Sequence, residues 1–251
     1  MTALVEVNNI SKSFESFLAV DDINFSLDRG EVLGFLGPNG AGKTTTMRIL
    51  TGFLKPSSGS IKINGLDLFK NLKKAREFIG YVPEGSPLYN EMTTIDFLSF
   101  ICEIRNIDKS QNLGKIIKLL NLDEVLLQKI DTLSKGFKRR VGLAQALVHD
   151  PKILILDEPT DGLDPNQKHE VRKLIKKLGK EKSIIISTHI LEEVKAICNR
   201  TMILSNGKLL IDDTPTNVLK KSRSYNNLLV SVYDKSANEL KKELQALNNF
   251  K

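Results

Sequence analysis

Residues 32–44 read Val-Leu-Gly-Phe-Leu-Gly-Pro-Asn-Gly-Ala-Gly-Lys-Thr, a short apolar run that leads into a glycine-rich turn. The apolar run, Val32–Leu36, has the length of a buried strand, and a helical pattern follows the turn over Lys43–Leu50. The turn matches the pattern Gly-x-x-x-x-Gly-Lys-Ser/Thr at every fixed position. Similar strand-like runs alternate with helical patterns further along, which predicts an α/β fold with a mainly parallel sheet.

The residue types of this turn suit a bound polyphosphate. Glycines allow a tight backbone turn whose N–H groups point at phosphate oxygens, and the helix behind it adds the positive end of its dipole. In such a loop Lys43 contacts the β- and γ-phosphates, and the Thr44 hydroxyl ligates Mg²⁺. A chance glycine-rich turn is the alternative, and the strand and helix on either side argue against it. The predicted nucleotide-binding residues here are Gly37, Pro38, Asn39, Gly40, Ala41, Gly42, Lys43, Thr44 and Thr45.

Two adjacent carboxylates end a second apolar run. Ile153–Leu156 leads directly into Asp157 and Glu158, and alternation along a strand sends neighbouring side chains to opposite faces. Phosphoryl transfer needs one acid for the metal ion and one group for the attacking water. We therefore expect Asp157 to ligate Mg²⁺ and Glu158 to act as the general base. A solvated strand end is the alternative, and the phosphate loop upstream favours the catalytic interpretation.

Strand signals vanish between residues 89 and 149, which indicates a helical insertion. We therefore expect a core at 1–88 and 150–225, the insertion at 89–149, and a short β-α appendage at 226–251. The predicted helices are Thr93–Ile104, Gly114–Leu120, Gly136–Val148, Gln167–Leu178 and a last one with Leu240, Leu244 and Leu247 on one face. The further predicted strands are Ser183–Ser187, two within Arg200–Ile211 around the turn Asn206-Gly207, and Leu228–Val232.

Composition narrows the function classes. The net charge of +7 suits nucleic acid, an anionic membrane or nucleotides. No basic stretch is interleaved with aromatic residues and the chain has no Trp, so we expect solvated helix faces and no nucleic-acid partner. No run approaches the roughly 18 apolar residues of a membrane span, and the N-terminus lacks the pattern of a secretory signal. Cys102 and Cys198 lack metal-ligand spacing, and we expect core residues in a reducing compartment.

Four further motifs resemble those of one family, the ABC ATPases. Residues 133–137, Leu-Ser-Lys-Gly-Phe, resemble its signature motif, whose usual form is LSGGQ. Asp161–Asp164 resembles the D-loop, His189 resembles the switch histidine, and Phe14 occupies the place of the aromatic residue that stacks on adenine. These motifs follow the family's order, and the resemblance covers about residues 5–211. It implies a P-loop NTPase (RecA-like) core with an antiparallel β subdomain and an inserted helical subdomain.

The resemblance also implies a mechanism. ABC domains work as head-to-tail dimers that hold ATP and Mg²⁺ between the phosphate loop of one chain and the signature of the other. Ser134 and Gly136, at a helix N-terminus, would bind the γ-phosphate across that interface. Lys43, Glu158 and His189 are the expected catalytic residues, with His189 near the γ-phosphate and the attacking water. The expected partners are an integral membrane permease and a second ABC ATPase subunit, in a homodimer or a heterodimer.

Two residues depart from the family pattern. Glu84 stands where the family usually has the glutamine of the Q-loop. A carboxylate can still ligate Mg²⁺ or its water, although it cannot donate a hydrogen bond when ionised. Glutamate at this place resembles a subset of export ATPases, related to gliding motility and to drug and polysaccharide export. Lys135 replaces the first glycine of the signature, where it either crowds the nucleotide or adds a cation, and we expect ATPase activity to survive both departures.

The segment Thr93–Ile104 is apolar around much of its circumference and follows Tyr89 and Met92. Burial inside the helical insertion explains this pattern, and so does a groove that receives a short helix of a membrane subunit. An exporter ATPase at the cytoplasmic face of the plasma membrane is the function that the resemblance implies. The alternative is a soluble ABC ATPase in cofactor assembly or another process without transport.

Overall fold

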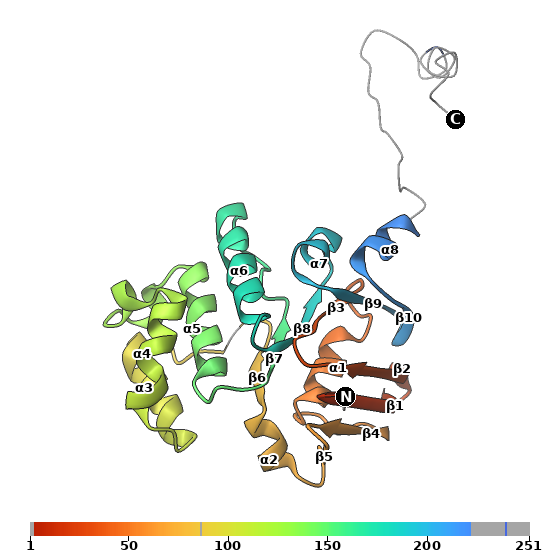
Figure 1. Cartoon of the computed structure of the whole chain (residues 1–251), viewed down its shortest axis with the longest axis horizontal. Coiled ribbons are helices and arrows are strands. Elements are labelled where there is room, and N and C mark those ends of the chain that lie inside the picture. The colour runs from red at the N-terminus through yellow and green to blue at the C-terminus, as the bar shows by residue number, and fades with distance from the viewer. Residues whose placement is uncertain (1–2, 86, 222–238, 240–251) are drawn as a thin grey trace. The chain divides into compact units, whose positions relative to one another are not determined.

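Two sheets organise the fold, and helices cover the larger one (Figure 1). The computed structural model describes residues 3–85, 87–221 and Glu239, and the compact unit with all the motifs ends at Val218. The described strands are β1 Val5–Phe14, β2 Phe17–Leu27, β3 Val32–Leu36, β4 Ser58–Ile63, β5 Leu66–Asp67, β6 Ile79–Val82, β7 Ile153–Asp157, β8 Ser183–Thr188, β9 Arg200–Ser205 and β10 Lys208–Asp213. The described α-helices are α1 Lys43–Leu50, α2 Leu72–Glu77, α3 Thr94–Ile104, α4 Lys109–Leu120, α5 Lys135–Leu147, α6 Pro165–Leu178, α7 Leu191–Ile197 and α8 Pro215–Lys220.

The larger sheet has six strands in the order β10-β9-β3-β8-β7-β6. All neighbours in it pair in parallel except β10, which is antiparallel to β9. The smaller sheet has four antiparallel strands in the order β2-β1-β4-β5. The α/β fold with a mainly parallel sheet, an antiparallel β subdomain and a helical insertion is therefore confirmed.

The central strands are apolar on both faces because both faces of the large sheet are covered. In β7, Ile153 and Ile155 join a buried cluster with Met47 of α1 and with residues of the small sheet. Leu154 and Leu156 point to the other face, into a cluster with residues of α5 and α6. This arrangement places α1, and the phosphate loop that precedes it, between the two sheets.

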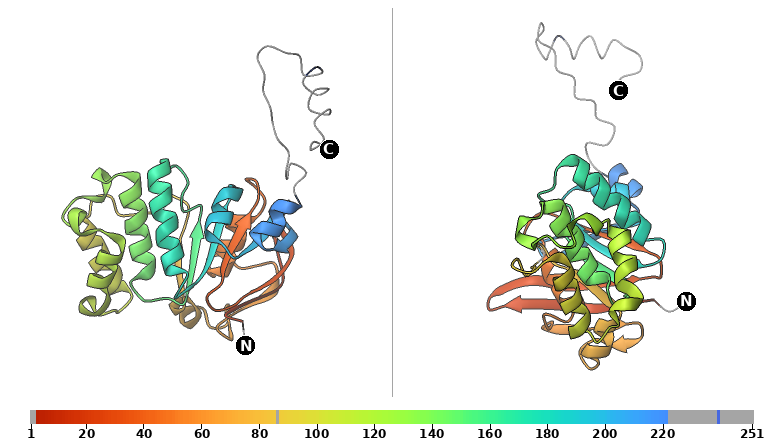
Figure 2. Two further views of the ribbon diagram at one scale, coloured as in Figure 1. Left: turned by 45° about the horizontal axis from the view of Figure 1, so that its top comes forward. Right: turned by 90° about the vertical axis from the view of Figure 1, so that its left-hand side faces the viewer.

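Helices α3, α4 and α5 form the predicted insertion between β6 and β7, and Figure 1 and Figure 2 show them at the opposite end of the unit from the small sheet. Helix α4 begins at Lys109, five residues before the predicted start. The prediction started too late because the apolar pattern begins only at Leu113. Helix α6 begins at Pro165, two residues before its predicted start. There Asp164 caps the helix by accepting from the backbone N–H of Gln167 at 2.9 Å.

Helix α5 lies directly against β6. A Cβ atom on Gly80 would overlap the carbonyl oxygen of Ala146, so only glycine permits this approach of helix to strand. At the other end of the helix the side chain of Ser134 accepts from the backbone N–H of Phe137, so Ser134 is the N-cap and α5 starts at Lys135.

The hairpin of β9 and β10 turns at Asn206-Gly207, as predicted, with φ of 49° and 77° at these two residues. Cys102 is buried in the cluster of the helical insertion, and Cys198 packs against it. The predicted strand and helix of the appendage lie outside the described residues, apart from Glu239. Within the part of the chain that the structure describes, no helix is long and apolar enough to cross a membrane.

Candidate active site

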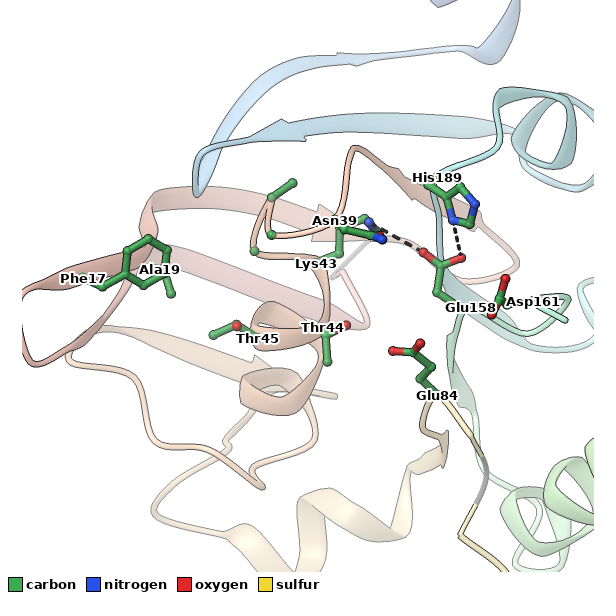
Figure 3. Close-up of a pocket in the computed structure, with 13 residues that line it drawn as sticks. Phe17, Ala19, Asn39, Lys43, Thr44, Thr45, Glu84, Glu158, Asp161 and His189 are labelled. Atoms are coloured by element: carbon green, nitrogen blue, oxygen red, sulfur yellow. Dashed lines mark hydrogen bonds and ion pairs between the residues drawn. The ribbon is translucent and has the colours of Figure 1, made fainter.

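The phosphate loop borders a cavity of about 390 Å³ at the C-terminal end of β3. Gly40 and Gly42 of the loop have φ of 80° and 97°, a region that side chains disfavour. A Cβ on Gly42 would also lie 2.6 Å from the carbonyl oxygen of Ala19. The cavity is drawn in Figure 3, and its lining residues are Phe17, Ala19, Asn39, Gly40, Ala41, Gly42, Lys43, Thr44, Thr45, Glu84, Glu158, Asp161 and His189.

Lys43 lies inside the loop, with 5% of its surface exposed. Its ammonium donates to the carbonyl oxygens of Gly37 and Pro38 at 2.8 and 3.1 Å. The same Nζ atom lies 3.6 Å from Oε1 of Glu158 (Figure 3). A buried cation that faces the cavity is the group that the phosphate chain of a nucleotide requires.

Glu158 and His189 face each other across the cavity wall, with Oε2 and Nδ1 3.2 Å apart (Figure 3). Burial raises the pKa of the Glu158 carboxyl, while the charges of Lys43 and His189 oppose that rise. A carboxylate that is neither fully solvated nor neutralised can accept a proton from water at the cavity. The arrangement therefore suits a general base with a histidine beside it.

Asp157 and Glu158 do not follow the alternation predicted for a continuing strand. Strand β7 ends at Asp157, and Glu158 has a φ of 45°, so the backbone turns out of the sheet between them. Two groups hold this turn: Ser187 Oγ accepts from the N–H of Glu158 at 2.9 Å, and the buried guanidinium of Arg139 donates to its carbonyl oxygen at 3.2 Å. Both carboxylates therefore face the phosphate-loop side, with different contacts.

Asp157 lies against the first turn of α1. The Thr44 hydroxyl donates to Oδ1 of Asp157 at 3.2 Å, and the Ser187 hydroxyl donates to the same oxygen. The second oxygen, Oδ2, is buried and has no hydrogen-bond partner within residues 3–85 and 87–221. A carboxylate with a free oxygen beside a threonine hydroxyl fits Mg²⁺, which proteins hold through one or two carboxylates together with substrate phosphates.

Glu84 lines the same cavity as Thr44 and Glu158, on the loop after β6 (Figure 3). The structure thus brings all three predicted metal ligands, Thr44, Asp157 and Glu84, to one region. In the described residues no three Asp, Glu, His or Cys side chains gather into a separate metal site.

Four predicted nucleotide contacts besides Phe14 are not among the residues that line the cavity: Gly37, Pro38, Ser134 and Gly136. Ser134 is exposed at the start of α5, and Gly136 is buried against the side chain of Gln167. Phe14 is also absent from the lining; the residue is 45% exposed, and its ring centroid lies 5.1 Å from the Lys12 ammonium. Its partner across the tip of the β1–β2 hairpin, Phe17, lines the cavity instead.

The structure adds residues to which the sequence analysis assigned no role in the site. Phe17, Ala19 and Asp161 line the cavity, and Ser187 and Arg139 support the end of β7. Asp161 is the first residue of the D-loop motif, so the sequence did contain a signal that could have placed it in the site. A single serine at the end of a buried strand, or an arginine inside a helix, has no spacing that would mark it in the sequence.

A match to a family model covers residues 20–161, and the description of that family is ABC transporter. The match spans more than half of the chain and includes the phosphate loop, the signature and the acidic strand end. The chain belongs to the ABC transporter ATP-binding family, whose members bind and hydrolyse ATP.

Individual relatives are similar over most of the chain. An uncharacterized ABC transporter ATP-binding protein of Bacillus subtilis, YhcH, is 40% identical over 84% of this chain and 70% of its own length. The bacitracin transport ATP-binding protein BcrA of Bacillus licheniformis is 37% identical over 94% of this chain and 78% of its own length. Among solved structures, cbiO1 of Clostridium perfringens, part of an ABC transporter complex, has a TM-score of 0.80 and 31% identity, over 88% of this chain and 92% of that one.

Proposed function

We propose that this chain is the ATP-hydrolysing subunit of a membrane exporter, bound to a permease at the cytoplasmic face of the plasma membrane. The observation that carries the proposal is the cavity in which Lys43, Glu158 and His189 meet beside the Thr44–Asp157 contact. Likeness to a bacitracin transport ATPase supports transport, and Glu84 at the Q-loop position supports the export type. Mg²⁺ would be held by Thr44, Asp157 and Glu84 and would supply charge stabilisation for the transferred phosphoryl group.

ATP-driven dimerisation is the second element of the proposal. Ser134 is exposed at a helix N-terminus and lies outside the cavity of its own chain. In a head-to-tail dimer, Ser134 and the Gly136 backbone of one chain would bind the γ-phosphate of ATP held by the other. Phe14 or Phe17, at the tip of the β1–β2 hairpin, would stack on the adenine.

The contact with the permease is proposed at the start of α3. Phe97, Leu98 and Cys102 are buried in the helical insertion, so burial explains one face of this apolar helix. Tyr89, which precedes the helix, is 57% exposed, and its ring lies 5.6 Å from that of Phe100 in an edge-to-face arrangement. Because this patch follows the Glu84 loop in the chain, a permease helix seated on it could respond to the nucleotide.

The proposal is tested by expressing this chain together with an integral membrane protein that a neighbouring gene encodes. We expect the two chains to purify together and to move substrate across vesicles only with ATP. Tyr89→Ala should abolish co-purification while ATP hydrolysis by the free subunit continues. Leu127→Ala is the matched control, because Leu127 is an exposed apolar residue of the same insertion, at 84% exposure. An ATPase that turns over normally but binds no membrane chain would favour the soluble alternative.

A further inference from the structure

Glu193, in the first turn of α7, has a buried carboxylate with three partners. Its side chain is 3% exposed. Oε1 accepts from the Thr160 hydroxyl at 2.5 Å and from the Arg172 guanidinium at 3.2 Å, and Oε2 accepts from the Thr188 hydroxyl at 2.8 Å. Both threonines are themselves buried. This cluster lies outside the residues that line the cavity, and no step of hydrolysis described above uses it.

The partners of Glu193 belong to the segments that carry the catalytic groups. Thr160 stands between Glu158 and Asp161, on the turn after β7. Thr188 directly precedes His189 at the end of β8, and its hydroxyl also accepts from the N–H of Ile190 at 3.1 Å. One carboxylate therefore joins the segment of the general base to the segment of the histidine.

We propose that Glu193 is a positioning residue for ATP hydrolysis, which holds the Glu158–Asp161 segment and the His189 segment in one fixed arrangement. Leaving an oxygen of a buried carboxylate without a hydrogen-bond donor costs free energy. The movement of either threonine away from Glu193 is therefore opposed. The two segments consequently move together as nucleotide binds and leaves. The proposal concerns hydrolysis and does not depend on the proposed role in transport.

Isosteric substitutions test this link on the full chain. Glu193→Gln keeps the volume but replaces one acceptor oxygen with an amide NH₂, which cannot accept from a threonine hydroxyl. Thr160→Val and Thr188→Val remove the two hydroxyl donors and keep the side-chain shape. Glu192→Gln is the matched control, because Glu192 is the preceding residue of the same helix and is exposed.

We expect kcat of Glu193→Gln to fall by roughly 10–100-fold, the effect of a small misplacement of catalytic groups. ATP binding measured without Mg²⁺ should be unchanged, because Lys43 and the phosphate loop are untouched. The Thr160→Val, Thr188→Val double variant should lose kcat to a similar extent. Combining all three changes should cause no further loss, since they remove one shared set of contacts. The control should keep wild-type turnover.

Normal kcat in Glu193→Gln, or losses that multiply when the changes are combined, would overturn the proposal. Parallel losses of melting temperature and of ATP binding would also overturn it, because they indicate a role in folding alone. If Glu193→Gln does not fold, the single threonine variants carry the test, since each leaves the carboxylate two of its three partners. Unchanged kcat in both of them would then reject the positioning role.

Discussion

The cavity at the phosphate loop and the first turn of α5 differ in how their polar groups are partnered. At the cavity, the carboxylate of Glu158 lies 3.6 Å from the Lys43 ammonium and 3.2 Å from the His189 ring. At the first turn of α5, Ser134 is exposed and its hydroxyl accepts from an N–H of its own helix. The proposed catalytic groups are thus assembled inside one chain, whereas the helix end that suits a phosphate is exposed on the surface. The proposed dimer would bring the two regions together.

Replacement of Glu158, the proposed general base, should have the largest effect on the cavity side of this comparison. Glu158→Gln should lower ATP turnover by about 10²–10⁴-fold, because the amide cannot accept the proton of the attacking water. ATP binding should persist, so an ATP-bound dimer should accumulate in gel filtration. Glu31→Gln is a matched control, because it breaks a 3.2 Å ion pair with Arg200 at the other end of β3. Near-wild-type hydrolysis by Glu158→Gln would mean that another group is the base.

A mixture of two damaged chains tests whether the two regions complete each other. Lys43→Ala damages the cavity and Ser134→Arg blocks the α5 turn, so each homodimer should be inactive. A mixed dimer contains one site with both halves intact. Mixing should therefore restore ATP-dependent dimerisation, measured by light scattering, and part of the turnover. If Ser134→Arg alone has a rate per chain that stays constant on dilution, each chain forms its own complete site.

Glu84 lines the cavity, and the chain continues from it to the proposed permease patch at Tyr89. Its replacement should therefore have a moderate effect. In Glu84→Ala we expect ATP affinity to remain nearly intact, since Lys43 and the loop still bind the phosphates. Hydrolysis should no longer respond to the membrane partner, which substrate-stimulated ATPase assays in vesicles would measure. Normal transport by this variant would reduce Glu84 to a solvated loop residue.

The smallest expected effect is a displaced pH dependence at the cavity. Glu158 must be ionised to act as a base, and burial raises its pKa above the ordinary value of 4.5. Activity should therefore fall as the pH is lowered, with a midpoint above 4.5. Single-turnover rates at saturating ATP, measured across the acid range, give this midpoint. A midpoint at or below the ordinary value would show that the charges of Lys43 and His189 outweigh burial.

The central sheet could be predicted from sequence because β3, β7 and β8 are continuous apolar runs, which burial on both faces requires. The small sheet could not be derived residue by residue and followed only from the family resemblance. Its strands β1 and β2 pair with several register shifts, so their apolar residues do not alternate regularly. The start of α4 was missed for a related reason, since its first turn is polar.

The candidate site was predictable where chemistry demands a fixed spacing. The phosphate loop and the acidic strand end have that property, and the structure brings Lys43, Thr44 and Asp157 together. The aromatic residue at the hairpin tip has no such fixed spacing, because Phe14 and Phe17 face each other across the tip and either could serve. The Glu193 cluster joins single polar residues from separate elements, and only the folded chain shows that they meet.

The close approach at Gly80 fixes the C-terminal end of helix α5 against β6, while its N-terminal end is about three turns away. At the C-terminal end of the helix the Ala146 carbonyl packs against β6, the strand that precedes Glu84. Ser134 caps the N-terminal end. The helix rises about 18 Å between those two residues, so a tilt of about 5° at the clamp displaces Ser134 by about 1.6 Å. That distance is enough to make or break a hydrogen bond. In the proposed dimer, a small displacement of the strand before Glu84 would therefore change the distance between Ser134 and the bound phosphate.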